Sequence, residues 1–399
     1  MDKSLPTEVR YLAIIQLKNG IDRYFRKSAV DAISPEERTS IRSNLLDSGM
    51  NEAEPLLAKQ TSLAISKVIR MDWPLEWPEA LTDLIAKLRI AADTNTLHLR
   101  RGLLILLQVV KELSTARLKR SQTSLQSVTP EIVYLLSTIY LSNVQKWTAF
   151  FAGNGDDEGG AMDAMESSLY CLKILRRLLI AGYEYPHRDT VVERIWTQSQ
   201  EHFGQFLDLI SRQPPVLVSP ALKATEKHLF QLAKLHLAMA ESHPLSFTRL
   251  PGSVALTRAY WGLIANFGES YSSATVVATD KLASGADMRN AKPAMETLAL
   301  KGLNILRACA KNIFKPTPSF KFRTPATKEE EKQAMKYLQT ELLTNELVLE
   351  MARTIVTKFF VFRQVDLEAW DEEPDEWEAR EEGGGDTWQF EIRACSERL

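Results

Sequence analysis

Histidine is the residue type of this chain best suited to proton transfer or metal binding at neutral pH. The sequence contains six histidines, at His98, His187, His202, His228, His236 and His243. None belongs to an H-E-x-x-H sequence, the spacing that puts two zinc ligands on one face of a helix. His236 falls within an apolar helical pattern, so we interpret it as a packed core residue rather than a catalytic base.

The sequence also lacks the patterns of nucleophilic and nucleotide-dependent enzymes. It has no Gly-x-Ser-x-Gly, no P-loop and no dinucleotide-binding fingerprint. Gly383, Gly384 and Gly385 lie in an acidic tail with no strand before them, so they do not form a phosphate-binding loop. We therefore predict a protein that is not an enzyme and that carries no metal and no cofactor.

The three cysteines, Cys171, Cys309 and Cys395, are far apart in the sequence. Their number and spacing exclude a disulfide scaffold and a zinc site. Each lies in or beside an apolar helical pattern, so we expect reduced, buried thiols and an intracellular protein.

Composition narrows the class of protein further. The chain has 399 residues, of which 45% are hydrophobic, and a formal net charge of −2. A chain this apolar is not disordered, and a nearly neutral chain lacks the basic surface that direct nucleic-acid binding requires. The N-terminus has no signal-peptide core, and the most apolar run, residues 103–110, is shorter than the ~20 residues that span a bilayer. We therefore predict no membrane insertion.

Apolar residues recur at steps of three and four along most of the chain, which is the spacing of one face of an α-helix. Such a stripe is formed by Ile14, Leu17, Ile21 and Phe25. The breaks between stripes carry helix-start signals, an N-cap residue followed by a first-turn proline. These signals stand at Ser34 and Pro35, at Thr129 and Pro130, and at Ser219 and Pro220.

The stripes and breaks predict about six antiparallel helix pairs. They are residues 9–25 with 35–47, 53–70 with 78–91, 96–118 with 130–151, 162–182 with 189–211, 220–241 with 251–268, and 294–314 with 332–362. One pair cannot bury its apolar faces alone, whereas stacked pairs of this length can. We therefore predict an all-α fold, a right-handed α-solenoid of about six tandem HEAT-type pairs. A globin or four-helix bundle is the alternative all-α fold, and six tandem pairs favour the solenoid.

Three stretches interrupt the predicted array. Residues 153–160 are predicted to form a flexible acidic loop, and the proline-rich residues 315–327 are not expected to form regular helix. Residues 366–386 are dense in Asp and Glu, which is typical of a solvated acidic linker. Trp370 and Trp377 within that stretch favour docking onto another surface, such as the solenoid's own inner face.

Two segments carry motifs that are more specific than helical periodicity, and a third segment carries a weaker match. Residues 9–46 contain Leu17, Lys18, Asn19 and Ile21, followed by an I-x-x-E-E-x-x-x-I-R-x-x-L-L pattern that ends at Leu46. Residues 64–84 contain two Trp-Pro steps, Trp73 with Pro74 and Trp77 with Pro78. The weaker match is formed by residues 367–377. Together they resemble the importin-β (karyopherin-β) family of nuclear transport receptors, and most of all the importin-eleven-type branch.

Physical chemistry gives these motif residues their own interpretation. The Trp-Pro steps bias both tryptophans away from helical backbone, so we expect Trp73 and Trp77 to pack between repeats. Lys18 and Asn19 lie off the apolar stripe. They either bridge neighbouring repeats or reach a partner.

The resemblance implies a division of the chain. Residues 1–91 correspond to the N-terminal homology region, residues 92–362 to further HEAT repeats, and residues 363–399 to an acidic, tryptophan-containing linker with the start of the next repeat. The family has further helices before the segment that starts here at Val9, and residues 392–399 are predicted to be the first turns of another helix. We therefore expect a chain cut at both ends.

The resemblance also implies partners. They are the small GTPase Ran in its GTP form, protein cargo and the Phe-Gly nucleoporins, in a protein that shuttles between nucleus and cytoplasm. We expect Ran on the inner face of the first repeats, where the sequence offers Arg38, Arg42, Lys87, Arg89, Arg100 and Arg101. An exportin of the same family and a HEAT-repeat scaffold outside transport are the alternatives. RanGTP lowers cargo binding by an importin and raises it for an exportin.

Overall fold

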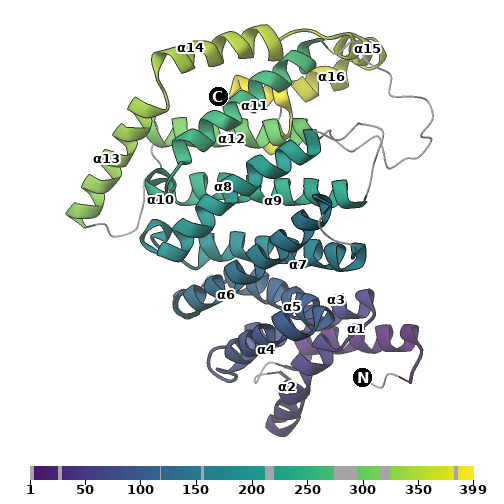
Figure 1. The fold of residues 1–399 in the computed structure, drawn as a ribbon. Coiled ribbons are helices and arrows are strands. Elements are labelled where there is room, and N and C mark those ends of the chain that lie inside the picture. Colours follow the sequence, from purple (N-terminus) through teal and green to yellow (C-terminus); the bar gives the residue numbers. More distant parts are fainter. Residues whose placement is uncertain are drawn as a thin grey trace. The chain divides into compact units, whose positions relative to one another are not determined.

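The structure is a computed structural model that describes residues 4–25, 29–116, 118–153, 157–211, 220–273, 294–314, 324–381 and 385–399. Within these residues the regular secondary structure is helical (Figure 1). The predicted all-α fold is therefore confirmed. The chain divides into two compact units, Met1–Glu184 with Val218–Gln231, and Tyr185–Leu217 with Leu232–Leu399.

The first unit is built from two sets of helices. One set is α1 (Thr7–Tyr24), α3 (Pro55–Asp72), α5 (Thr96–Ser114) and α7 (Glu158–Ala181), which pack side by side in succession. The other set is α2 (Pro35–Met50), α4 (Ala80–Thr94) and α6 (Lys119–Phe151). α2 and α4 pack against α5, and α6 packs along α7. The start of α9 (Pro220–Ser242) also belongs to this unit.

Helix α5 forms the core of the first unit. Four consecutive residues, Leu103, Leu104, Ile105 and Leu106, are all buried and so face every side of the helix, because α3, α4 and α7 all contact it. A helix that is apolar all round is expected in such a position. Gly102 lets α4 approach closely, since a Cβ at that position would lie 2.7 Å from Cδ2 of Leu88.

Polar contacts in the first unit reveal the length of its repeat. Six of them join residues that are 40–45 positions apart in the sequence. They are Arg10–Glu52, Lys18–Gln60, Asp22–Lys67, Asp47–Lys87, Arg70–Glu112 and Arg89–Glu131. This separation is the length of a HEAT or armadillo repeat, roughly 40–47 residues. Equivalent positions of successive repeats are therefore tied together by side chains.

The second unit begins with a short 3-10 turn, η1 (Pro186–Arg188), and α8 (Thr190–Ser211). It continues through the rest of α9, α10 (Pro244–Arg249), α11 (Ser253–Ser273), α12 (Ala294–Phe314), α13 (Pro325–Glu341) and α14 (Asn345–Thr354). A π-helical turn (Ile355–Phe359), α15 (Gln364–Glu372), α16 (Pro374–Glu381), η3 (Gly385–Phe390) and α17 (Ile392–Glu397) complete it. α11 packs against α12, and α12 packs against α13 and α17.

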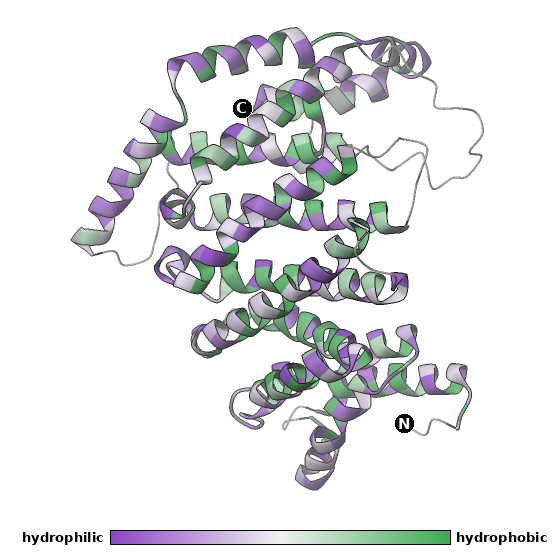
Figure 2. Cartoon of the chain, in the orientation of Figure 1, coloured by the Kyte–Doolittle hydropathy of each residue, from purple (hydrophilic) through white to green (hydrophobic). Residues whose placement is uncertain are grey.

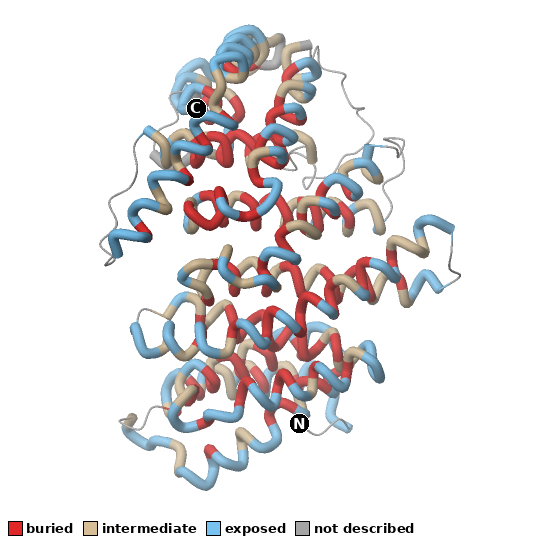
Figure 3. Tube along the Cα trace, turned by 60° about the vertical axis from the view of Figure 1, so that its left-hand side comes forward, coloured by how far each residue is buried: buried red, intermediate tan, exposed pale blue. Residues whose placement is uncertain are grey.

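Buried positions follow the faces that helices turn toward their neighbours within each unit. Apolar residues lie on those faces in Figure 2, and the same positions are buried in Figure 3. α13 of the second unit is sparsely buried, because only Thr327, Ala334 and Leu338 of its 17 residues are buried. It is therefore held by few apolar contacts.

Two predicted helix boundaries are wrong. Thr129 and Pro130 do not start a helix, since α6 begins at Lys119 and Pro130 lies inside it. Thr129 is buried and its hydroxyl donates to the Leu125 carbonyl at 2.7 Å, the bond of a mid-helix threonine rather than of an N-cap. The predicted helix over 332–362 is instead α13, α14 and the π turn, because Thr344 caps α14 by accepting from the Leu347 amide at 3.3 Å.

The three predicted interruptions are also shorter than expected. α7 starts within the first, because Asp157 caps it by accepting from the Gly160 amide at 2.8 Å. α13 starts within the second at Pro325, and residues 315–323 lie outside the described residues.

The acidic third stretch contains α15 and α16 in its described part, and its role as a linker stays a prediction. Its Trp370 is half exposed. The boundaries of the two compact units differ from the domain boundaries predicted at residues 91 and 362. Compact units and homology regions are different divisions of a chain, so the predicted domain boundaries stay predictions.

Candidate binding surface

The first motif segment packs as a repeat-stacking helix. Ile14, Ile21 and Phe25 of α1 are buried, and Leu17 is half-buried. The Lys18 ammonium donates to Oε1 of Gln60 on α3 at 2.8 Å, while Asn19 is exposed. Of the two roles considered for Lys18, bridging of neighbouring repeats is therefore the one that the structure contains.

The double Trp-Pro element ends α3 and leads into α4. Trp73 has extended backbone, with φ −84° and ψ 140°, and its amide donates to the Ile69 carbonyl at 2.8 Å. The bond between Trp73 and Pro74 is cis. Both Trp73 and Trp77 are buried, as expected of packing residues, and Pro78 lies in the turn before α4 begins at Ala80.

Asp72, the last residue of α3, is a buried carboxylate surrounded by arginines of α2. Nε of Arg42 donates to its Oδ2 at 2.8 Å, and Nη2 of Arg42 lies 2.6 Å from the same oxygen. Arg38 lies 3.7 Å away, donates to the Phe25 carbonyl and stacks on the Phe25 ring. A buried carboxylate is tolerated only when it is paired in this way, so these arginines hold α2 in place.

An open groove of about 630 Å³ lies between α2 and α4. Its charged lining residues are Arg42, Asp47, Glu76, Glu79, Asp83 and Lys87. Trp77 and Ile90 add apolar surface, and Ile90 is 66% exposed. The Lys87 ammonium lies 2.5 Å from Oδ1 of Asp47 across the groove. A groove of this mixed character suits a polar protein surface better than a small apolar ligand. We call it the α2–α4 groove.

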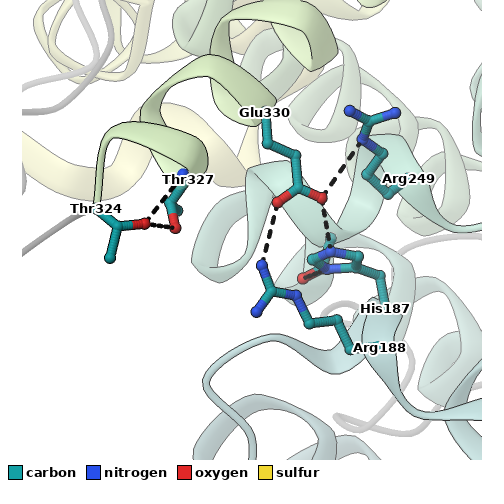
Figure 4. A network of polar contacts seen from close by, with 7 residues as sticks. His187, Arg188, Arg249, Thr324, Thr327 and Glu330 are labelled. Atoms are coloured by element: carbon teal, nitrogen blue, oxygen red, sulfur yellow. Dashed lines mark hydrogen bonds and ion pairs between the residues drawn. The ribbon is translucent and has the colours of Figure 1, made fainter.

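In the second unit, Glu330 of α13 lies among three basic groups (Figure 4). Its Oε1 lies 3.3 Å from Nε2 of His187 and 3.8 Å from Nε of Arg249, and its Oε2 accepts from Arg188 at 3.2 Å. Nδ1 of His187 contacts the Ser246 hydroxyl at 2.8 Å. Burial opposes the charged carboxylate, but hydrogen bonds from Arg188 and His187 lower the pKa of Glu330 overall. Desolvation by burial lowers the pKa of His187, against the pull of Glu330.

The Glu330 contacts join α13 to η1 and α10. No local sequence pattern predicts this group of contacts, because its members lie up to 143 residues apart. We call it the Glu330 clamp.

The remaining candidates for chemistry are enclosed. His236 is buried, and its ring contacts the Ser199 hydroxyl at 3.1 Å and the Tyr260 hydroxyl at 2.9 Å. Burial lowers the pKa of His236 to about 3, so the ring is neutral at physiological pH. The core position predicted for His236 is confirmed.

Burial also accounts for the three cysteines. Cys171, Cys309 and Cys395 are all buried thiols, as predicted. Burial raises the pKa of Cys309 to about 12 and that of Cys395 to about 11, which keeps both thiols protonated and unreactive. Neither a triad of metal-ligating side chains nor a helix suited to crossing a bilayer occurs among the residues that the structure describes.

Comparison with known proteins shows that the chain is similar to nuclear transport receptors. Residues 1–50 match the Importin-beta N-terminal domain. Importin-11 of Homo sapiens is 28% identical over 398 residues, which are 99% of this chain and 37% of that protein. Importin beta-like protein KAP120 of Saccharomyces cerevisiae is 29% identical over 395 residues, 98% of this chain and 36% of that protein. The chain therefore resembles importin-β receptors over nearly its whole length.

A solved structure agrees with this assignment. The structure of Lph2, described as a novel bidirectional nuclear transport receptor in S. cerevisiae, has a TM-score of 0.81 at 26% identity. The match covers 99% of this chain and 36% of Lph2. The chain therefore spans little more than a third of the length of these importin-β relatives.

The six basic residues that we predicted for Ran binding do not form one surface. Arg42 and Lys87 share the α2–α4 groove. Arg38 and Arg101 are buried, and Arg101 donates to the carbonyls of Glu52 and Ala53 at 2.7 and 2.6 Å.

The other two residues of the set contact neighbouring helices. Arg89 is exposed and lies 3.3 Å from Glu131 of α6. Arg100 reaches Asp163 and Glu166 of α7 at 2.8 and 2.9 Å. A role of any of the six in Ran binding stays a prediction.

Proposed function

We propose that this chain acts as the N-terminal part of an importin that carries protein cargo through the nuclear pore under the control of RanGTP. The similarity to importins over 99% of the chain, with the N-terminal domain match at residues 1–50, carries this proposal. The protein shuttles between nucleus and cytoplasm and has no enzymatic activity of its own. Residues 1–91 act as the N-terminal homology region, and the later helices extend the repeat array.

Ran in its GTP form binds at the α2–α4 groove. The groove is open, lies on helices of the domain and of the repeat that follows it, and presents Lys87 beside Arg42. Arg89 stands two residues farther along α4, with 61% of its side chain exposed. The buried Arg38 and Arg101 act indirectly, by holding the helices that form this surface.

Cargo and Phe-Gly nucleoporins are the other partners of such a receptor. A repeat array suits several partners at once, because it offers a long surface whose neighbouring units slide on one another. If RanGTP and cargo affect each other's binding, their coupling is reciprocal, so each changes the affinity of the other by the same factor.

Export is the second candidate function, and one observation favours it. The solved relative Lph2 is described as bidirectional, so a receptor of this architecture can work in both directions. A HEAT-repeat scaffold outside transport is a third candidate, which the N-terminal domain match disfavours.

Affinity isolation from cell extract, with and without a hydrolysis-resistant GTP form of Ran, tests the proposal. An importin loses bound proteins when RanGTP is added, and an exportin gains them. Bound proteins that do not respond to RanGTP would support the scaffold and overturn the transport function.

A further inference from the structure

Four basic residues gather on α5 and α7 of the first unit, and none of them lines the α2–α4 groove. They are Lys111 of α5 and Lys173, Arg176 and Arg177 of α7. Lys173 and Arg177 are one helical turn apart and so share a face of α7, and α5 packs beside α7. We call these four residues the α5–α7 basic cluster.

The members of the cluster are close enough to repel one another. Burial lowers the pKa of Lys111, and the charges of Arg177 and Lys59 lower it further. Burial also lowers the pKa of Lys173, followed by the charges of Lys111, Lys227 and Arg177, while the charge of Glu166 raises it by a smaller amount. With Lys59 on α3 and Lys227 on α9, the positive charge extends across four helices of the unit.

Nearby carboxylates neutralise the cluster only in part, since Glu166 attracts the Lys173 ammonium but is shared with other partners. Glu112 pairs with Arg70, and Glu166 binds Arg100 at 2.9 Å and the Tyr170 hydroxyl at 3.0 Å. Within the described residues, no carboxylate lies within ion-pair distance of the four cluster members.

The cluster's own hydrogen bonds go to uncharged acceptors. Lys111 donates to Oε1 of Gln108 at 3.2 Å, and Arg177 donates to the Lys173 carbonyl at 2.8 Å. Nε of Arg176 is buried without a partner. Half-buried cations with few counter-charges destabilise a fold, so an anion supplied from outside would stabilise this surface.

We propose that the α5–α7 basic cluster, with Lys59 and Lys227 at its ends, binds an extended acidic segment of a partner protein. Neighbouring helix axes lie about 8–10 Å apart, so the row of charges over four helices spans roughly 25–30 Å. An extended chain covers this distance with about eight or nine residues at ~3.3 Å each. A compact anion would reach only one end of the row.

The surroundings favour an acidic peptide over nucleic acid. Glu112, Glu166 and Asp163 lie on the same two helices, so the positively charged area is limited and suits a short acidic segment rather than a long nucleic-acid strand. The chain as a whole carries a net charge of −2, which does not attract a polyanion over long range. This surface is separate from the proposed Ran site, so its test does not depend on the transport function.

Fluorescence anisotropy with a labelled peptide of about ten alternating Glu and Ser residues tests the proposal on the whole chain. The comparison peptide has Gln in place of Glu. The variant is Lys173→Gln with Arg177→Gln, and the matched control is Lys332→Gln with Lys336→Gln, an exposed pair with the same spacing on α13. Thermal melting without peptide checks folding, and loss of like-charge repulsion is expected to leave the α7 variant at least as stable as the parent.

We expect the Glu peptide to bind at least tenfold more tightly than the Gln peptide, and its binding to weaken as salt is raised. The α7 variant is expected to lose about tenfold in affinity, and the α13 variant to bind like the parent. Equal binding of the two peptides, or an unchanged affinity of the folded α7 variant, would overturn the proposal. So would a single-stranded RNA of the same length that binds more tightly through Lys173 and Arg177.

Discussion

Arg42 of α2 binds the carboxylate of Asp72, at the end of α3, through two nitrogens. Its Nε lies 2.8 Å and its Nη2 2.6 Å from Oδ2 of Asp72. The same guanidinium donates to the Glu76 carbonyl at 2.7 Å in the turn that leads to α4. One side chain therefore connects α2 to α3 and to the α3–α4 turn. This connection sets the geometry of the α2–α4 groove, in which we place Ran.

Replacing Asp72 with alanine is expected to destabilise the first unit by about 3 kcal/mol, because Arg38 and Arg42 would keep their charges without a counter-ion. Urea denaturation of the chain measures this change. Asp22→Ala is the control, since that carboxylate is 55% exposed in its pair with Lys67 and is expected to contribute less than about 1 kcal/mol. Equal losses in the two variants would show that the Asp72 pairing does not stabilise the unit.

Reversing the charge of Lys87 and Arg89 together is expected to weaken RanGTP binding by about tenfold, or about 1.4 kcal/mol. Both side chains are partly exposed, so the fold tolerates the change, unlike reversal of the half-buried Arg42. Calorimetric titration with Ran measures the affinity, and Lys332→Glu with Lys336→Glu serves as the control. An affinity equal to that of the control would remove α4 from the proposed Ran site.

The buried His236 predicts a loss of stability in mild acid. Its pKa in the folded chain is about 3, below the unfolded value of about 6.5. The folded state therefore binds fewer protons, so stability is complete above pH 6.5 and falls as the pH drops toward 3. At pH 5 the loss is about 2 kcal/mol.

Thermal unfolding at pH 7 and pH 5 measures this dependence. In a His236→Gln variant, which keeps a polar side chain but does not titrate, the difference between the two pH values is expected to shrink. An undiminished difference would assign the acid sensitivity to other groups, such as His202, whose pKa is lowered by burial to about 4.

The Glu330 clamp predicts that α13 can be loosened without unfolding its unit. Glu330→Gln removes the charge that attracts Arg188 and Arg249, and few buried residues remain to hold the helix. Amide hydrogens of α13 are expected to exchange faster, with those of α5 unchanged. The neighbouring exposed Glu329→Gln is the control, and equal exchange in both variants would argue against the clamp.

The sequence predicted the helices well, because apolar periodicity and N-cap chemistry are local properties. Ser34 caps α2 as expected, accepting from the Glu37 amide at 3.2 Å while the Glu37 carboxylate accepts from the Ser34 amide at 2.9 Å. The same reasoning failed at Thr129, because a threonine before proline also fits inside a helix when its hydroxyl bonds four residues back. The choice between the two depends on burial, which local sequence does not determine.

The candidate site was predicted less completely. Arg38 and Arg101 have the spacing of exposed helix residues, but their burial depends on a carboxylate or carbonyls from other helices. The α5–α7 basic cluster and the Glu330 clamp were missed for the same reason. Their members come from helices that only the folded repeat array brings together.

Direct binding of Ran tests the central claim most closely. Isothermal calorimetry measures the affinity of the chain for Ran loaded with a hydrolysis-resistant GTP analogue. The same measurement, in the same buffer, gives its affinity for Ran loaded with GDP. We predict that the GTP form binds at least a hundredfold more tightly, about 2.7 kcal/mol. We also predict that the Lys87 and Arg89 reversal narrows this difference. Equal affinities for the two nucleotide forms, in a chain that is folded by thermal melting, would contradict the account.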